Sequence, residues 1–596
     1  MNGGRAPANL LPLGADGRPL SRRGRFGARP RRRQPPRWFH DRSAELRSAG
    51  GVIREHQVFG AVLLVATLVR AIAMLGFAPA LWYPDSLPYV HAALYVAPYR
   101  IRPVGYSFML WALRPSHSFT LVVLIQHAMG LAAGTAIYAL LRHRFRMPGW
   151  AATLAAIPPL LSAYTIQLEH FILSDTLFGF LLTMAVVVML WRPVPPVWIC
   201  ALAGLLLSGA AVVRSEGLPL MVPFCLFLVP CLRGIRVIAG FLVMCIAFAV
   251  PVLSYEQWFD RAYGTFAETS STGAFLYGRV STFADCSIIK PPADEQWLCL
   301  TVPPGKRVQS PDYYVWGTNS PIKHGPGPEF GHEVDRLATD FDRHAIMAQP
   351  LDYLRAVLYS SFLSFRTSPT QTQYLFPAGT PKPLQAVATS NDENVSDAYT
   401  YGRGDPSTRV VAPFAEIARG YQRFAVVPGW LLGLIALAGL TGMAASWRRL
   451  GGPALLPWLT GFVLLVSPAA TAGFSARYVV ASVPAFCLAA ALGAKQLAER
   501  VQAKADLQPG VVHAVNGGER NRGYQVPPGR PAIEQPLLGT GRRIGPQRRV
   551  SAGDARQAGL RLAEARGENQ QPRAVSGEHL DRARARHPDP AQRPVR

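Results

Sequence analysis

The chain has 596 residues and a formal net charge of +25, and only 16% of its residues are charged while 49% are hydrophobic. About a quarter of the residues of a soluble domain are charged, so this chain is unusually apolar for that class. Residues 1–57 hold 13 Arg against four acids, and residues 500–596 hold 18 Lys and Arg against nine acids. This distribution excludes a uniformly basic nucleic-acid-binding globule and indicates a membrane protein with two basic tails.

The body of the chain contains ten apolar runs, most of them close to the ~20 residues that span a bilayer. They lie at about 58–80, 119–141, 150–168, 171–191, 197–213, 217–232, 235–254, 425–446, 453–470 and 476–497. The predicted fold class is therefore an all-α polytopic membrane protein of about ten transmembrane helices. A large polar segment separates the seventh helix from the eighth.

The same pattern divides the chain into five regions and orients them. They are a basic tail (1–57), seven helices (58–254) with an outer loop (81–118), a polar segment (255–424), three helices (425–498) and a second basic tail (499–596). With ten spans, the basic connections all fall on one side, and short cytoplasmic loops are rich in Lys and Arg. We therefore expect cytoplasmic termini and an extracytoplasmic polar segment.

The two tails are rich in Arg, Pro, Gly and Ala and have little apolar surface to bury, so we expect most of them to be disordered. They serve either as solvated orientation signals or as binding segments for anionic membrane lipids. Cys286 and Cys299 are the only cysteines of the polar segment, and an isolated pair in an oxidising compartment favours a disulfide. Neither the cysteines nor the histidines follow a zinc-site spacing.

Acidic residues are rare in the membrane body, and their positions are informative. Only Asp85, Glu169, Asp175 and Glu216 occur there, and each is predicted at the outer end of a span or in an outer loop. Basic residues join them at the same face: Arg70, Arg100, Arg102, Arg214 and Arg477. Charged groups near hydrocarbon usually face a protein interior or a wet cavity, so the pattern indicates an outward polar site. The alternative is that helix ends at this face simply tolerate charge.

Asp85 follows the first span and precedes the aromatic and apolar stretch 86–99, which resembles an interfacial segment on the outer leaflet. A carboxylate in this place is suited to take a proton from an acceptor hydroxyl. Nearby cations are suited to hold a lipid phosphate leaving group at the same time.

Five short motifs together resemble the GT-C superfamily of polyprenyl-phosphate-sugar-dependent glycosyltransferases, most closely its protein mannosyltransferase-like branch. They are Asp85, the run Arg102-Pro-Val-Gly-Tyr106, Pro158, the run Ser174-Asp-Thr-Leu-Phe178, and Arg477-Tyr478. The polar segment with its cysteine pair resembles an actinobacterial-type variant. The resemblance implies inverting transfer with Asp85 as general base. Many members carry two adjacent acids where this chain has Asp85-Ser86, which leaves metal dependence and the acceptor open.

The resemblance and the charge pattern together nominate a set of substrate-binding residues. These are Arg70, Arg102, Tyr106, Asp175, Arg214, Glu216, Arg477 and Tyr478. Two structural alternatives stand beside them, since Arg70 can instead pair with a carboxylate and Arg214 with Glu216 can form a bridge between helix ends. No metal ligand is nominated.

The expected function is transfer of a sugar from a polyprenyl phosphate to a glycan, lipid or protein acceptor of the cell envelope, at the outer face of the membrane. A ligase or polymerase of lipid-linked glycans is the first alternative, because such enzymes also combine many spans with a large outer loop. The second is a non-enzymatic transporter or envelope scaffold, although transporters tend to show internal repeats and broken midplane helices.

Overall fold

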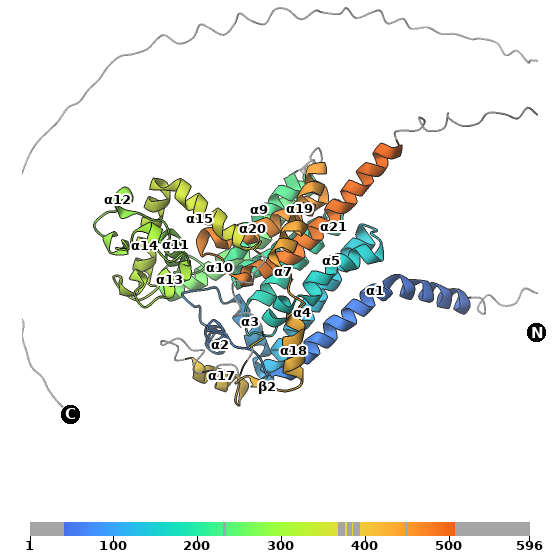
Figure 1. Cartoon of the computed structure of the whole chain (residues 1–596), viewed down its shortest axis with the longest axis horizontal. Helices are drawn as coiled ribbons and strands as arrows, with labels where there is room; N and C mark the ends of the chain where they lie inside the picture. Colours follow the sequence, from blue (N-terminus) through green and yellow to red (C-terminus); the bar gives the residue numbers. More distant parts are fainter. Residues whose placement is uncertain are drawn as a thin grey trace, which may run out of the picture. The chain divides into compact units, whose positions relative to one another are not determined.

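The computed structural model describes residues 41–229, 234–366, 376–377, 379, 384, 394–446 and 451–506 (Figure 1). The predictions of disorder in residues 1–45 and most of 505–596 fall largely outside the described residues, although the structure places Asp41 onward in helix α1. The seven-helix region contains α1 (Asp41–Gly76), β1 (Phe77–Ala78), α2 (Ser86–Tyr95), α3 (Gly105–Leu113), η2 (Arg114–Ser116), α4 (Phe119–Ala139), η3 (Leu140–Arg144), α5 (Gly149–Leu161), α6 (Ala163–Leu168), α7 (Asp175–Leu190), α8 (Val197–Val213), η4 (Ser215–Leu220), α9 (Met221–Leu228) and α10 (Ile235–Tyr263).

The polar segment and the last membrane region follow. Their elements are α11 (Thr272–Val280), α12 (Cys286–Ile289), η6 (Gln296–Leu298), η7 (Pro304–Lys306), α13 (Pro311–Trp316), η8 (Pro321–His324), α14 (His332–Ala348), α15 (Pro350–Leu363), α17 (Val395–Gly402), β2 (Arg409–Val410), α18 (Phe414–Gln422), α19 (Gly429–Ala445), η10 (Gly452–Ala454), α20 (Leu455–Thr471) and α21 (Ala476–Asp506).

The predicted all-α polytopic class is confirmed. By length and composition, five helices of the described chain are apolar enough to cross a membrane: His56–Gly76, Phe119–Arg144, Ile235–Tyr263, Gly452–Thr471 and Ala476–Gln502. Five shorter apolar helices occupy the other predicted positions: Gly149–Leu161, Asp175–Leu190, Val197–Val213, Ser215–Leu228 and Gly429–Ala445. Hydrophobicity alone therefore located the apolar helices, because every buried backbone group in a bilayer must be paired within its own segment.

The predicted span 150–168 is wrong as a single helix. The structure ends α5 at Leu161, places Ser162 in an extended conformation, and starts the short helix α6 at Ala163. Two consecutive prolines, Pro158 and Pro159, lie inside the last turns of α5. Proline has no amide hydrogen to donate and its ring crowds the preceding turn, so a break here is the expected physical outcome.

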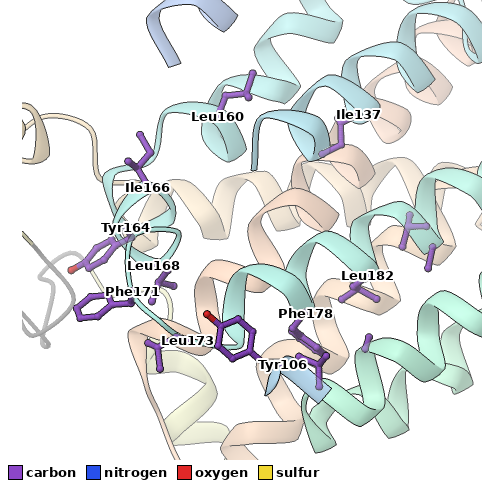
Figure 2. Close-up of a cluster of buried hydrophobic side chains, with 14 of the residues drawn as sticks. Tyr106, Ile137, Leu160, Tyr164, Ile166, Leu168, Phe171, Leu173, Phe178 and Leu182 are labelled. Carbon is purple, nitrogen blue, oxygen red and sulfur yellow. The ribbon is translucent and has the colours of Figure 1, made fainter. Parts of the chain in front are cut away.

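Side chains from several apolar helices form one buried core (Figure 2). Ile137 of α4, Leu160 of α5 and Leu182 of α7 are almost inaccessible, and Tyr106 of α3 lies in the same core as Phe178 of α7. The core thus includes side chains of α7, which begins at Asp175, and of the short helix α3, which follows Arg102.

The segment after Asp85, which the sequence likened to an interfacial segment, is mostly buried within the protein. Residues Ser86–Leu94 of α2 are buried apart from His91, and α2 packs against α3 and α17. The His91 ring Nδ1 lies 2.7 Å from Oδ2 of Asp397 in α17. The returning part of the polar segment thus covers the face that the sequence assigned to lipid.

The polar segment also returns to the first long helix. Phe77 in β1 pairs antiparallel with Val410 in β2, and α18 packs along α1. A side chain at Gly76 would approach the backbone nitrogen of Ala415 to 2.8 Å, so this crossing needs glycine. Residues on the two sides of the predicted boundary at residue 424 therefore do not pack as independent domains, because the polar segment also packs against the first long helix.

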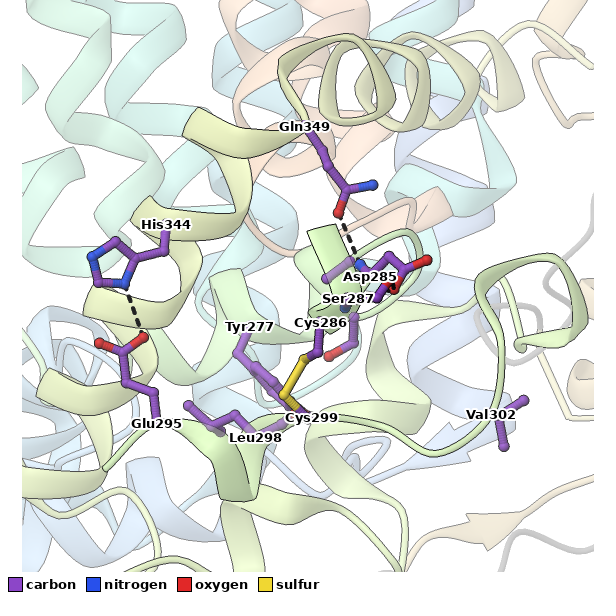
Figure 3. The surroundings of a disulfide bond; sticks show 12 residues. Tyr277, Asp285, Cys286, Ser287, Glu295, Leu298, Cys299, Val302, His344 and Gln349 are labelled. Carbon is purple, nitrogen blue, oxygen red and sulfur yellow. Dashed lines mark hydrogen bonds and ion pairs between the residues drawn. A yellow bond between two sulfur atoms is a disulfide. The ribbon is translucent and has the colours of Figure 1, made fainter. Parts of the chain in front are cut away.

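The first part of the polar segment has a core of its own, built from α11, α13 and α14. The predicted disulfide between Cys286 and Cys299 is present in the structure (Figure 3). Beside it, the Tyr277 hydroxyl donates a hydrogen bond of 2.7 Å to the Leu298 carbonyl. The disulfide therefore closes a loop directly against the core of this segment.

Candidate active site

The fold brings together charged residues that lie at or near the ends of different elements. Asp85 precedes α2, Asp175 starts α7, Arg214 caps the end of α8, and Arg477 lies in the first turn of α21. Asp85 and Arg477 are 392 positions apart in sequence yet form a direct ion pair. The expectation that the sparse charges converge at one place is met for these four residues.

Arginines and carboxylates alternate in this site. Arg102 pairs with Oδ2 of Asp85, and Nη1 of Arg477 lies 2.9 Å from the same oxygen. The Nε of Arg477 then donates to Oδ1 of Asp175 at 3.0 Å, and Nη1 of Arg214 reaches that oxygen at 2.9 Å. Each guanidinium therefore lies beside a carboxylate, as partly desolvated charges require.

Arg214 extends the alternation to Glu216. Its Nη2 lies 3.0 Å from Oε1 and its Nε 3.3 Å from Oε2, which is a two-point contact of the kind that orients a guanidinium. We call the six residues Asp85, Arg102, Asp175, Arg214, Glu216 and Arg477 the charge cluster. Its three guanidinium groups balance its three carboxylates, and the Arg214–Glu216 bridge that the sequence left as a structural alternative is part of it.

Aromatic rings cover the arginines of the charge cluster. The Arg214 guanidinium carbon lies 5.2 Å from the centre of the Tyr478 ring, and that of Arg477 lies 5.6 Å from the centre of the Tyr83 ring. Cation–π contacts at these distances stabilise desolvated guanidinium groups. Tyr478, predicted from the sequence, thus lies at the site.

Two buried polar atoms of the charge cluster have no hydrogen-bond partner within the described part of the chain. They are Nε of Arg102, a donor, and Oδ2 of Asp175, an acceptor. An unsatisfied buried polar atom costs about 1–3 kcal/mol. One donor and one acceptor left open within a single cluster are typical of a site that binds a polar ligand.

The Asp85 carboxyl is held as a carboxylate. Burial raises its pKa, but Arg102 and Arg477 outweigh this effect, and the pKa falls from 3.8 to about 2. Asp85 is therefore ionised at any physiological pH and is a weak base while both arginines hold it.

Two predicted substrate-binding residues are not part of the charge cluster, although Tyr106 lies near Asp175. Nε and Nη2 of Arg70 donate to the two oxygens of Glu169 at 2.7 and 2.8 Å, and both side chains are 2% exposed. The His127 ring adds a contact of 2.8 Å to Glu169. Tyr106 is fully buried, and its hydroxyl donates to Gln126, which in turn donates to the Glu169 carbonyl. These contacts match the structural alternative for Arg70 and give Tyr106 a packing role.

The polar segment contributes charged residues that sequence reasoning missed. Asp312 of α13 lies near enough to Asp85 and Arg477 to feel both charges: burial and Asp85 raise its pKa, while Arg477 and Arg279 oppose the rise. The segment holds 18 acids and 15 basic residues, so no rarity distinguished Asp312 in the sequence. Only the packing of α13 identifies it.

Arg279 of α11 is a buried guanidinium of a different kind. It is 2% exposed, its Nη2 donates to the Ser360 hydroxyl at 2.9 Å, and its Nε has no partner among the described residues. Burial lowers its pKa to about 10, and no carboxylate of the described chain lies within ion-pair distance. A buried cation without a carboxylate partner is a candidate anion contact.

A small cavity of about 10 Å³ lies between α15, α20 and the start of α21. Ser360, Gly473 and Tyr478 line it together with apolar residues such as Leu465 and Val479. Ser360, whose hydroxyl accepts a hydrogen bond from Arg279, and Tyr478, whose ring covers Arg214, therefore line the same cavity. Within the described chain, no group of three or more His, Cys, Asp or Glu side chains is placed to hold a metal ion.

No known family model matches the chain, and no curated protein matches it. Two solved structures do, both of ArnT from Cupriavidus metallidurans, one bound to undecaprenyl phosphate and one in the apo state. Each is 12% identical; the first covers 76% of this chain and 79% of that chain at a TM-score of 0.29, and the second 77% and 79% at 0.26. Neither match bears on the mannosyltransferase-like branch. At these TM-scores the likeness carries no argument about activity.

Proposed function

We propose that the protein is an integral membrane glycosyltransferase that moves a sugar from a polyprenyl phosphate to an acceptor at the outer face of the membrane. The observation that carries the proposal is the charge cluster, in which the Asp85 carboxylate lies between two guanidinium groups. A base and a set of anion-binding donors side by side are what transfer from a phosphate leaving group requires.

The donor phosphate is proposed to contact Arg102 and Arg477. The open Nε of Arg102 offers a donor without displacing any existing bond, and Arg102 is 19% exposed against 7% for Arg477. Arg279 is an additional phosphate contact, because it is a buried cation that forms no ion pair with a carboxylate of the described residues, although Asp312 lies near enough to influence it.

The reaction is proposed to invert the anomeric carbon. The acceptor hydroxyl oxygen attacks this carbon, the bond from the carbon to the phosphate oxygen breaks, and Asp85 accepts the hydroxyl proton. The electron pair of the broken bond leaves with the polyprenyl phosphate, whose added negative charge Arg102 and Arg477 stabilise. A phosphate that shares these guanidinium groups also weakens their hold on Asp85, which raises its pKa and makes it a better base.

We also propose roles for the other residues, an acceptor class and an orientation in the membrane. Asp175 and Glu216 orient the sugar or the arginines, the acceptor is a glycan, lipid or protein, and the site is extracytoplasmic with both termini cytoplasmic. Anionic membrane lipids are proposed to bind the basic tails. We assign no metal ligand, and the effect of EDTA on transfer tests for a divalent ion.

The test uses purified protein in proteoliposomes with a panel of radiolabelled farnesyl phosphosugars and a panel of hydroxyl acceptors. The proposal expects release of farnesyl phosphate together with a glycosylated product of inverted anomeric configuration. Transfer of whole preassembled glycan chains, lost on substitution of arginines in 255–424 but not of Asp85, would instead favour a ligase or polymerase. Movement of label across the bilayer without a covalent product would favour a transporter.

A further inference from the structure

We propose that Glu268 binds a hydroxyl group of the transferred sugar as an uncharged carboxylic acid. This inference rests on the proposed function and adds a residue from the polar segment to the sugar-binding part of the site. It arises from a carboxyl group that the charge cluster does not use and that the fold nonetheless buries next to it.

The Glu268 side chain is 94% buried, since its residue is only 6% exposed. Neither carboxyl oxygen has a hydrogen-bond partner of ordinary geometry within the described residues, although the Ser215 hydroxyl lies close. A buried carboxyl that makes no hydrogen bond costs several kcal/mol as an anion and about 1–3 kcal/mol even as a neutral acid. A ligand that supplies the missing bonds relieves that cost.

The position of Glu268 follows from its neighbours on two sides. Two residues further along, the Ser270 amide donates to the Arg100 carbonyl at 2.9 Å, and the Ser271 hydroxyl donates to the Ile101 carbonyl at 2.8 Å. These bonds align the segment with the loop that ends in Arg102. On the other side lies Ser215, which separates Arg214 from Glu216 in sequence. Glu268 is thus placed beside the Glu216 end of the charge cluster, in a segment that is bonded to the loop before Arg102.

The surroundings favour the uncharged form. Burial is the largest influence, a hydrogen bond from Ser215 opposes it, and Glu256 of α10 and Glu216 of η4 add to it; together they raise the pKa of Glu268 to about 8. Tyr255 of α10 also lies near enough to interact with it. No cation figures among these influences, in contrast to Asp85, which two arginines hold as an anion.

An uncharged carboxylic acid presents one hydroxyl donor and one carbonyl acceptor on adjacent oxygens. A sugar hydroxyl, which both donates and accepts, matches this pair, whereas a phosphate, which is mainly an acceptor, does not need the carbonyl. The charge cluster supplies cations for phosphate, and Glu268 supplies the complementary contact for hydroxyl groups. The inference therefore separates recognition of the sugar from recognition of the lipid phosphate.

The experiment compares Glu268→Gln and Glu268→Ala with the wild-type enzyme in the proteoliposome assay. The probes are the farnesyl phosphosugar that the wild-type enzyme transfers fastest and farnesyl phosphate as a sugar-free competitor. At pH 7 we expect Gln, which keeps a donor and an acceptor, to hold KM within about threefold of wild type. Ala removes a hydrogen bond of about 1.5 kcal/mol and should raise KM roughly tenfold. Inhibition by farnesyl phosphate should be unchanged in both.

The pH profile separates this role from a structural one. Above pH 8 the wild-type Glu268 loses its proton, so KM for the phosphosugar should rise with pH, whereas the Gln variant should lack that rise. Glu256→Gln, which removes a neighbouring acid of the same type, is the matched control and should keep the rise. Melting temperatures in detergent verify that each variant is folded.

Equal KM values for the folded Ala variant and the wild type, or parallel pH profiles for wild type and Gln, would overturn the inference. Either result leaves the proposed function intact if Asp85→Asn still abolishes transfer. Absence of transfer by the wild-type protein with every phosphosugar would instead contradict the proposed function, and the inference with it.

Discussion

Asp85 is held between two guanidinium groups, and this arrangement fixes its titration. Burial alone would raise its pKa, yet the two arginines lower it to about 2. A group whose pKa is depressed in the folded protein contributes stability above its unfolded pKa and loses it as the pH falls. The carboxylate and its ion pairs should therefore persist down to strongly acidic pH.

Replacing Arg102 with Gln should move the acid limb of the pH–activity profile to higher pH. Only Arg477 then opposes the effect of burial, so the pKa of Asp85 rises. The measurement is the pH dependence of kcat/KM, in which the midpoint pH of the acid limb is compared rather than the maximum value. Arg336→Gln, which removes an exposed arginine paired with Asp340, should leave the limb in place. An unshifted limb in the Arg102 variant would contradict the assignment of Asp85 as the titrating base.

Glu169→Gln tests the structural role assigned to Arg70. The substitution leaves a guanidinium that is 2% exposed without its carboxylate, and breaking such a pair costs about 3–5 kcal/mol. We expect a lower melting temperature in detergent and near-normal kcat/KM per folded molecule. Loss of substrate affinity without loss of stability would restore the substrate-binding interpretation of Arg70.

The sequence was informative where charge is rare. Asp85, Asp175, Arg214 and Arg477 stand out because the apolar helices carry almost no other charges, and the structure joins all four. The rarity of charge could not distinguish Arg70 from the residues of the charge cluster, because Arg70 also lies among apolar residues but pairs with Glu169. Nor could it identify Asp312, Arg279 and Glu268, because acids and bases are common throughout their segment and only tertiary packing selects these three.

Helix positions were predictable for a comparable reason. An apolar run of sufficient length marks a helix by itself, whereas the break at Pro158–Pro159 and the burial of α2 depend on local chemistry and on a distant partner. α17, which covers α2, lies some 300 residues further along the chain, as the His91–Asp397 contact shows with its separation of 306. No periodicity within α2 encodes that contact.

The junction between α13 and the α20–α21 loop is a point where one methyl group should matter. Gly473 has φ +128°, and a side chain there would lie 2.8 Å from Cγ of Pro311 and 3.2 Å from Nη2 of Arg279. Gly473→Ala should therefore displace α13 and lower transfer by about tenfold or more. Gly234→Ala is the matched control, because Gly234 has φ +137° but nothing within 4 Å. Equal activity in the two variants would contradict the importance of this junction.

The Cys286–Cys299 disulfide should stabilise the polar segment locally. The cysteines are 13 positions apart, and closing a loop of about this length contributes roughly 3 kcal/mol. Reduction, or the double substitution to Ser, should speed limited proteolysis within residues 285–310. Because the bond packs beside Tyr277 rather than in the charge cluster, transfer by the remaining intact protein should persist. Immediate and complete loss of transfer on reduction would place the disulfide in the catalytic machinery.

At the scale of the whole molecule, the orientation in the membrane is open to a matched test. Val308 in the polar segment and Val194 between α7 and α8 are 47% and 55% exposed. With the polar segment outside, an impermeant maleimide should label Val308→Cys in intact cells and Val194→Cys only after permeabilisation, above the wild-type background. The reverse pattern would place the charge cluster at the cytoplasmic face.

The central claim is that the charge cluster carries out glycosyl transfer with Asp85 as the base. Its most direct test is the single-turnover rate of farnesyl phosphosugar consumption by Asp85→Asn, compared with Asp340→Asn, which removes an exposed carboxylate of the polar segment. Loss of a general base lowers a rate by about 10²–10⁴-fold. The account predicts a loss of this size for Asp85→Asn and a wild-type rate for Asp340→Asn; equal rates in the two folded variants would contradict it.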